Sequence, residues 1–208
     1  MLEFLNISHK YDKKIILNNF SMKLEAGEVV SLLGSSGCGK TTLLKLASGI
    51  EKLQKGEIKL NDKIVSSFNF HLNSDKRQIG YVFQDCALFP HLTIMENNFF
   101  SIKKYEIEKS SQKIQNLMDE IDISNLANNY PHELSGGQQQ QVALVRAMAS
   151  DPKIIFLDEP YSNLDSRLKE KIRDQMLHIL REYKISALLV THDPEEAMFM
   201  SDKIGILN

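Results

Sequence analysis

The chain has 208 residues, of which 42% are hydrophobic and 25% are charged, with a formal net charge of −2. This length suits one large domain, or one domain with an insertion, around a substantial core. The near balance of charges gives no general attraction to nucleic acids or acidic membranes, and so disfavours proteins that work by binding either one directly.

Two cysteines, Cys38 and Cys86, are present, and they form no C-x-x-C pair. Their number and spacing argue against structural disulfides and a zinc site and favour a reducing compartment. The N-terminus is too polar and too short for a signal peptide, and no run approaches the roughly 18 apolar residues of a membrane span. The sequence therefore predicts a cytoplasmic protein in which any membrane role comes through a partner.

The N-terminal part predicts two strands, because residues 2–8 and 14–25 alternate in the manner of half-exposed strands. Tyr11 stands at the end of the first strand. Its position alone fits an aromatic residue on a half-exposed strand as well as it fits a ligand contact. A turn at Ala26-Gly27 then leads into residues 29–33, whose apolar, β-branched composition predicts a buried strand.

The next stretch matches the phosphate-binding pattern G-x-x-x-x-G-K-[ST] at every fixed position. A helix is predicted directly after it, with Gly49 as the C-terminal cap. In this arrangement backbone N–H groups and the helix N-terminus face an anion, Lys40 reaches the β- and γ-phosphates, and the Thr41 hydroxyl binds Mg²⁺. A chance match in a glycine-rich turn is the alternative, and the flanking strand and helix disfavour it. We expect the triphosphate of a nucleotide to bind at Gly34, Ser35, Ser36, Gly37, Cys38, Gly39, Lys40, Thr41 and Thr42.

Residues 51–78 are charged and turn-rich, and we interpret their lysines as a solvated face. A short buried strand is predicted at residues 80–83, ending at Gln84. From about residue 85 to residue 149 the pattern changes from strand-rich to helical, which indicates a helical insertion.

An irregular apolar loop, residues 85–93, follows Gln84. Leu88 and Phe89 in this loop are candidates for an exposed docking surface rather than for the core, because exposed apolar pairs often mark an interface. Thr93 and Glu96 have the spacing of a capping box, which predicts that a helix starts there.

Ser135-Gly136-Gly137 precedes a helix predicted at residues 139–149, and such an N-terminus can hold an oxyanion. Taken alone, this tripeptide is a common loop. The apolar strand predicted at residues 154–157 gives it more weight, because that strand ends in two carboxylates, and such strand ends line the ligand crevice of parallel sheets.

Asp158 is suited to hold Mg²⁺ through water, and Glu159 is suited to accept a proton from an attacking water molecule. Residues 162–165 start a helix with an apolar core face. A further buried strand, residues 186–190, delivers His192 to the same edge of the sheet. A histidine there is more often structural, but its convergence with Glu159 favours a catalytic role.

Taken together, these motifs resemble the ATP-binding subunits of ABC transporters over essentially the full length of the chain. The motifs occur in the order of that family: the phosphate loop Gly34–Thr42, the glutamine loop at Gln84, the signature Leu134–Gln138, the magnesium and catalytic strand Ile154–Glu159, the aspartate loop Ser162–Asp165 and the switch histidine His192.

The resemblance implies an α/β fold: a P-loop NTPase core with a mostly parallel sheet, an N-terminal antiparallel β subdomain and a helical insertion subdomain. One ABC ATPase domain spans residues 1–208, with the core in 1–84 and 150–208 and the helical subdomain at about 85–149.

The resemblance also implies the site residues. Glu159, His192 and Gln84 are expected to be catalytic, and Thr41, Gln84 and Asp158 to hold Mg²⁺. Tyr11 is expected to stack on adenine. The signature residues are expected to bind the γ-phosphate held by a second copy of the chain. The other residues expected to contact the nucleotide are Ser135, Gly136, Gly137, Gln138 and Asp165.

By resemblance the cofactors are ATP and Mg²⁺, and the partners are a second copy upon ATP binding, integral membrane permease subunits and a solute-binding protein, with no nucleic acid. The expected location is the cytoplasm, peripheral on the inner face of the cell membrane. Residues 88–93 and 130–140 look like those of importers of ferric iron and related small solutes, and sulfate, polyamine, sugar and amino-acid importers share much of this pattern.

Two departures from the family pattern stand out. Gln141 replaces an arginine that many relatives carry. The chain ends at residues 204–208, where relatives add strands and often a regulatory domain.

Two other function classes compete: a soluble ABC-type mechanoenzyme, and a P-loop kinase of a small metabolite. The kinase would leave Ser135-Gly136-Gly137 unexplained.

Overall fold

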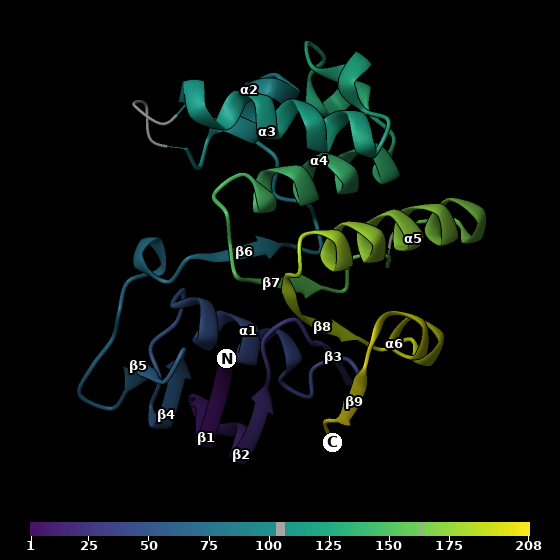
Figure 1. The fold of residues 1–208 in the computed structure, drawn as a ribbon. Coiled ribbons are helices and arrows are strands. Elements are labelled where there is room, and N and C mark those ends of the chain that lie inside the picture. Colours follow the sequence, from purple (N-terminus) through teal and green to yellow (C-terminus); the bar gives the residue numbers. More distant parts are fainter. Residues whose placement is uncertain (103–106, 163) are drawn as a thin grey trace.

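The computed structural model describes residues 1–102, 107–162 and 164–208, and in these residues the chain forms two sheets and a set of helices around them (Figure 1). The strands are β1 (Leu2–Tyr11), β2 (Lys14–Leu24), β3 (Val29–Leu33), β4 (Lys55–Leu60), β5 (Lys63–Ser67), β6 (Ile79–Val82), β7 (Ile154–Asp158), β8 (Ser186–Thr191) and β9 (Lys203–Ile206). The helices are α1 (Lys40–Ser48), α2 (Ile94–Phe99), α3 (Ile107–Glu120), α4 (Gly136–Met148), α5 (Ser166–Glu182) and α6 (Pro194–Met200).

One sheet is antiparallel, with the strand order β2-β1-β4-β5, and the other is parallel, with the order β6-β7-β8-β3-β9. The difference follows from the sequence pattern. Burial alternates along most of β1, as in a sheet with one covered face, whereas every residue of β7 and β8 is buried. This agrees with the α/β class expected from the sequence.

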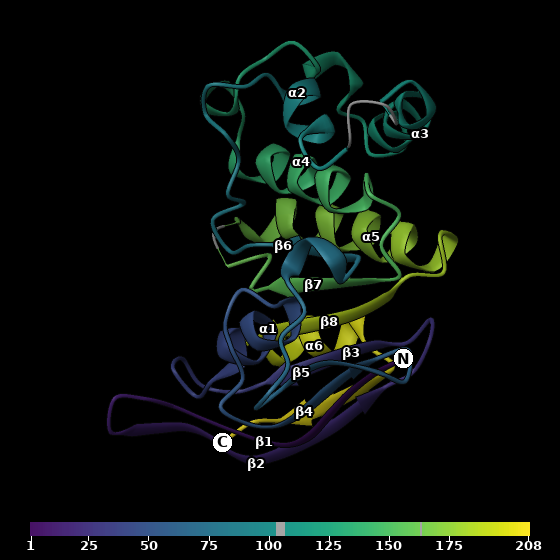
Figure 2. The same ribbon diagram turned by 90° about the vertical axis from the view of Figure 1, so that its left-hand side faces the viewer.

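The parallel sheet separates two hydrophobic clusters, and β7 contributes to both. Ile155 and Leu157 join the cluster that contains the buried faces of α3, α4 and α5. Ile154 and Phe156 join the cluster that α1 and the antiparallel sheet share. Figure 2 shows the resulting layers, with the antiparallel sheet at one end of the molecule and α2 and α3 at the other.

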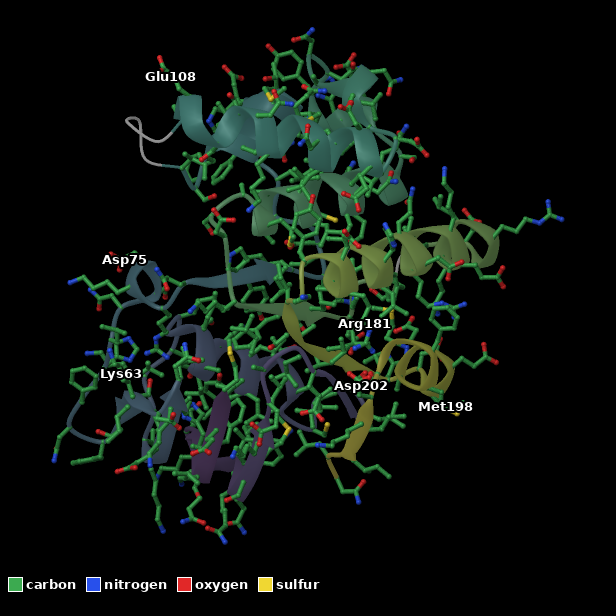
Figure 3. The ribbon with its side chains drawn as sticks, in the orientation of Figure 1. Lys63, Asp75, Glu108, Arg181, Met198 and Asp202 are labelled. Atoms are coloured by element: carbon green, nitrogen blue, oxygen red, sulfur yellow. The ribbon has the colours of Figure 1, made fainter. Side chains whose placement is uncertain are left out.

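Local signals explain several element ends. Gly49 caps α1 in the left-handed conformation (φ 78°), as predicted. Thr93 and Glu96 form the predicted capping box of α2. Near the C-terminal end of α5, Arg181 pairs with Asp202 at 2.7 Å (Figure 3). Asp202 also accepts a hydrogen bond from the Val29 N–H.

One predicted boundary is wrong. The sequence placed the start of the signature helix at Gln139, but α4 begins at Gly136 with Ser135 as its N-cap. The Ser135–Gln138 capping box starts the helix before the two glycines. Gly137 faces α5 in the first turn, where a Cβ would lie 2.5 Å from the Leu168 side chain. Within the described ranges, no helix combines the length and apolar character that a membrane crossing requires.

Candidate nucleotide-binding site

The phosphate-binding pattern forms the turn between β3 and α1. Gly39, at the N-cap of α1, has φ 109°, and a Cβ there would lie 2.9 Å from the Leu17 side chain, so only glycine fits. The Lys40 side chain is almost fully buried, and its Nζ donates to the carbonyl oxygens of Gly34 (2.7 Å) and Ser35 (3.0 Å). The turn thus curls around the ammonium group, which places a positive charge beside the backbone amides of the turn.

Asp158, the last residue of β7, lies next to the start of α1. Its carboxylate accepts hydrogen bonds from the Thr41 hydroxyl (2.9 Å) and from the Tyr81 hydroxyl (3.0 Å). Burial raises the pKa of Asp158 above its usual value, and the two hydroxyl donors oppose that rise. Asp158 and Thr41 offer oxygen ligands suited to Mg²⁺, which uses one or two protein groups and completes its shell with phosphates and water.

Sequence reasoning missed Tyr81 because it was assigned only to a buried strand, and it also missed Lys14 and Ile16, which line the cavity described below. Tyr81 comes from β6, the parallel neighbour of β7, and lies opposite Phe156. Its phenolic hydroxyl could have indicated a polar neighbour, because the hydroxyl of a tyrosine in a buried strand normally needs a hydrogen-bond partner.

Glu159 and His192 meet at the ends of neighbouring strands. The Glu159 carboxylate lies 3.0 Å from His192 Nδ1 and 3.6 Å from Lys40 Nζ. The Glu159 backbone is in the left-handed region (φ 45°), and its N–H donates to the Val190 carbonyl (2.9 Å). A non-glycine residue held in this region is strained, and such strain is typical of functional sites.

Lys40, Thr41 and Glu159 line one cavity of ≈ 440 Å³, a size common for small-molecule sites. Tyr11 and Gln84 lie on its wall together with the phosphate-binding turn. The Gln84 amide also donates to the Ser162 hydroxyl (3.4 Å). The lining residues are Tyr11, Lys14, Ile16, Ser36, Gly37, Gly39, Lys40, Thr41, Thr42, Gln84 and Glu159.

The signature residues lie elsewhere. Ser135 Oγ accepts from the Gln138 N–H (3.3 Å) while the Gln138 side chain accepts from the Ser135 N–H (2.9 Å), which forms a capping box. Gly136 lines a second cavity of ≈ 210 Å³, which Gln84 also lines. Ser135, Gly137 and Gln138 are not among the described residues that line the first cavity.

No described residue of the aspartate loop lines the first cavity, although Ser162 accepts the hydrogen bond from Gln84. Asp165 caps α5 by accepting a hydrogen bond from the Leu168 N–H (3.0 Å). Asn163, in the same predicted loop, lies outside the described residues. Cys38 is partly exposed in the phosphate-binding turn, whereas Cys86 is buried against Gln140.

A third cavity, which we call the aromatic groove, follows the glutamine loop. It has a volume of ≈ 380 Å³ and is lined by Ile79, Gly80, Tyr81, Phe83, Ala87, Phe89, Phe100, Ser101, Arg146, Ala147 and Ser150. Phe89 lines this groove and is half-buried rather than exposed, and its role in docking stays a prediction. Leu88 also differs from the expectation, since it is half-buried and packs against the core cluster of α3, α4 and α5.

Comparison with known proteins agrees with this geometry. The model of the ABC transporter family matches residues 17–162. An Fe(3+) ions import ATP-binding protein of Haemophilus influenzae is 43% identical over all of this chain, which spans 59% of that protein. A spermidine/putrescine import ATP-binding protein of Hahella chejuensis is 37% identical, and there the chain spans 56%. A sulfate/thiosulfate import ATP-binding protein of Pseudomonas syringae is also 37% identical, and there the chain spans 64%.

Among solved structures, the chain is similar to the ATP-binding cassette MJ0796 in a dimeric post-hydrolysis state bound to ADP and Pi. The TM-score is 0.82 with 31% sequence identity, covering 100% of this chain and 94% of that one. The chain therefore belongs to the ABC transporter family, whose ATP-binding proteins are ATPases, and it has the fold of an ATP-binding cassette.

Proposed function

We propose that this chain hydrolyses ATP as part of a dimer that drives the import of a small solute through a separate membrane permease. The observation that carries the proposal is that one cavity is lined by one member of each of two bonded pairs. Thr41 lines the cavity and donates to Asp158 at 2.9 Å, and Glu159 lines it and lies 3.0 Å from His192.

The residues divide the reaction among them. Lys40 and the amides of the phosphate-binding turn hold the β- and γ-phosphates. Thr41, Asp158 and Gln84 hold Mg²⁺, which supplies positive charge to the phosphate oxygens when bound. Glu159 accepts the proton of the attacking water, and His192 orients the Glu159 carboxylate. Tyr11 packs on the adenine ring.

A second copy of the chain completes the site. Ser135, at the N-terminus of α4, is exposed and lies off the first cavity, so its anion-binding geometry is available to a phosphate held by another molecule. Gly136, Gly137, Gln138 and Asp165 would lie at the same interface. The dimeric structures of the similar cassette MJ0796 support this arrangement.

The permease docks, in this proposal, at the aromatic groove. Gln84 stands in the chain between Phe83 and Ala87, which both line the groove, so movement of Gln84 at the nucleotide reaches the docked segment through residues 85–89. The chain then works as a peripheral subunit on the inner face of the membrane, in a system that includes a solute-binding protein.

Ferric iron is the first solute to test, because a ferric iron import protein is among the similar relatives and polyamine and sulfate import proteins are less identical.

Replacing Glu159 by glutamine tests the enzymatic core of the proposal. Glu159→Gln should bind ATP and accumulate as a dimer, while hydrolysis falls by about 10²–10⁴-fold, since a positioned base contributes about that much. Phosphate release and analytical ultracentrifugation measure the two effects. Glu195→Gln, an exposed glutamate near His192, is the matched control and should keep the parent rate. A Glu159→Gln rate within a few-fold of the parent would exclude Glu159 as the base.

A membrane pull-down separates the importer from the soluble ABC-type mechanoenzyme, the second candidate. Co-purification with an integral membrane permease supports the importer. Recovery with ribosomes or DNA and with no permease would support the mechanoenzyme instead.

A further inference from the structure

Three residues near the end of β1 are tied to the segment that follows α1. His9 Nε2 lies 2.9 Å from Glu51 Oε1, and the Tyr11 hydroxyl donates to Glu51 Oε2. Between them, Lys10 exchanges two backbone hydrogen bonds with the Gln54 side chain, each of 3.0 Å. We call these five residues the strand clamp.

Glu51 is the residue of the strand clamp that His9 and Tyr11 share. A carboxylate only accepts hydrogen bonds, so Glu51 uses both of its oxygens here, one for His9 and one for Tyr11. His9 is 3% exposed, and its Nδ1 has no hydrogen-bond partner among the described residues.

The strand clamp holds the ring of Tyr11 at two points. Its hydroxyl is bonded to Glu51, and burial together with this bond raises the pKa of Tyr11, which keeps the hydroxyl a donor. The His9 ring lies against the Tyr11 ring edge-on, with centroids 5.0 Å apart and an interplanar angle of 78°. Tyr11 nevertheless stays 41% exposed and lines the nucleotide cavity.

One helix therefore serves both ends of the cavity. The N-terminus of α1 carries Lys40 and Thr41, which face the phosphates, while Glu51 follows its C-terminus and reaches Tyr11. We propose that Glu51 is a positioning residue that orients the Tyr11 ring for the nucleotide base and sets its distance from the phosphate-binding turn. This inference rests on the proposed ATP-binding function.

The test separates base binding from phosphate binding. Tyr11→Phe keeps the ring and removes its bond to Glu51, and Glu51→Ala removes the acceptor. Each variant should weaken ATP binding by about 2–10-fold, because an untethered side chain must be immobilised on binding. Its KM for ATP should rise with kcat within twofold of the parent, and binding of inorganic triphosphate should not change. The Tyr11→Phe/Glu51→Ala double variant should bind ATP no more weakly than the weaker single variant.

Glu3→Gln is the matched control, since it removes a carboxylate on the same strand, where Glu3 pairs with Lys23. It should bind both ligands as the parent does. Equal losses of ATP and triphosphate binding in Tyr11→Phe would overturn the inference, as would additive losses in the double variant or unchanged ATP binding in both single variants. A parent protein that binds neither ligand would overturn the proposed function as well.

Discussion

Asp158 is a buried carboxylate that is expected to bind Mg²⁺, which is not part of the chain. Burial raises the pKa of Asp158 in the folded state. At pH values between the unfolded and the folded pKa, Asp158 is therefore protonated in the folded state and ionised in the unfolded state. Stability therefore falls as the pH rises through that window, and at neutral pH the ionised Asp158 costs stability. Mg²⁺ with nucleotide offsets that cost in the proposed function.

Asp158→Asn should thus separate stability from binding. Without Mg²⁺ and nucleotide, we expect the Tm at pH 7 to stay level or to rise by up to about 4 °C, because about 1 kcal/mol corresponds to roughly 2–4 °C in a chain of this size. Mg²⁺-dependent ATP binding should be lost. Calorimetry with and without Mg²⁺-ATP measures both, with the exposed Asp75→Asn as the control. A large fall in the metal-free Tm would contradict this account.

Most site residues were predictable because each belongs to a short motif with its own chemistry. Lys40 and Thr41 follow from the glycine pattern, and Asp158 and Glu159 from carboxylates at the end of a buried strand. Tyr81 was not predictable in the same way. Its partner is fixed by the pairing of β6 with β7, which joins residues far apart in the sequence.

At the scale of elements, Lys169 links α5 to the start of α6. Its ammonium pairs with Asp193 Oδ2 (2.5 Å) and with Glu196 Oε1 (2.6 Å). The hydrogen bond from Lys169 lowers the pKa of Asp193, the residue next to His192. A carboxylate whose pKa is lower in the folded state stabilises the fold at pH values above its unfolded pKa. That stabilisation is lost as the pH falls through the folded pKa.

Lys169→Met should therefore destabilise the protein by about 1–3 kcal/mol at pH 7, because the buried Glu196 carboxylate loses its counter-charge. The difference from the parent should shrink below about pH 4, where carboxylates become protonated. Urea unfolding at the two pH values measures it. Lys171→Met is the control on the same helix, since Lys171 and its partner Asp122 are both exposed and 3.7 Å apart. An equal loss at both pH values would exclude the ion pairs as its cause.

The signature helix shows where element boundaries escape sequence reasoning. Two glycines indicated a loop, because glycine weakens a helix. The Ser135–Gln138 capping box was the better local signal. The small size of Gly137 has a separate reason, the closeness of Leu168 on α5, and that is a tertiary contact.

At the scale of the molecule, the aromatic groove is the surface on which the permease proposal depends. The ring centroids of Phe89 and Phe100 are 4.0 Å apart, and the central carbon of the Arg146 guanidinium lies 6.0 Å from the Phe89 centroid. Phe89→Asp should abolish membrane assembly and transport and keep the basal ATPase rate of the isolated subunit within about twofold, because Arg146 can pair with the new carboxylate. Phe68→Asp, at a residue that is 77% exposed directly after β5, should change neither property. Loss of folding or of ATP binding in Phe89→Asp would show that Phe89 is a core residue.

The order of motifs predicted the architecture of the whole molecule better than hydrophobic periodicity could. Buried runs identified β3, β7 and β8 as strands, but periodicity does not say which strands are neighbours. The order β6-β7-β8-β3-β9 depends on pairings between distant segments.

That strand order has a consequence for synthesis on the ribosome. β3, which leads into the phosphate-binding turn, pairs with β8 and β9, and both follow it by about 150 residues or more. At about 5–20 residues per second, β3 waits roughly 8–30 s for a neighbour, while the β1–β2 hairpin can close at once. During that interval the apolar strand Val29–Leu33 is a natural target for a chaperone, and the turn that follows it acquires its final shape only when the last strands arrive.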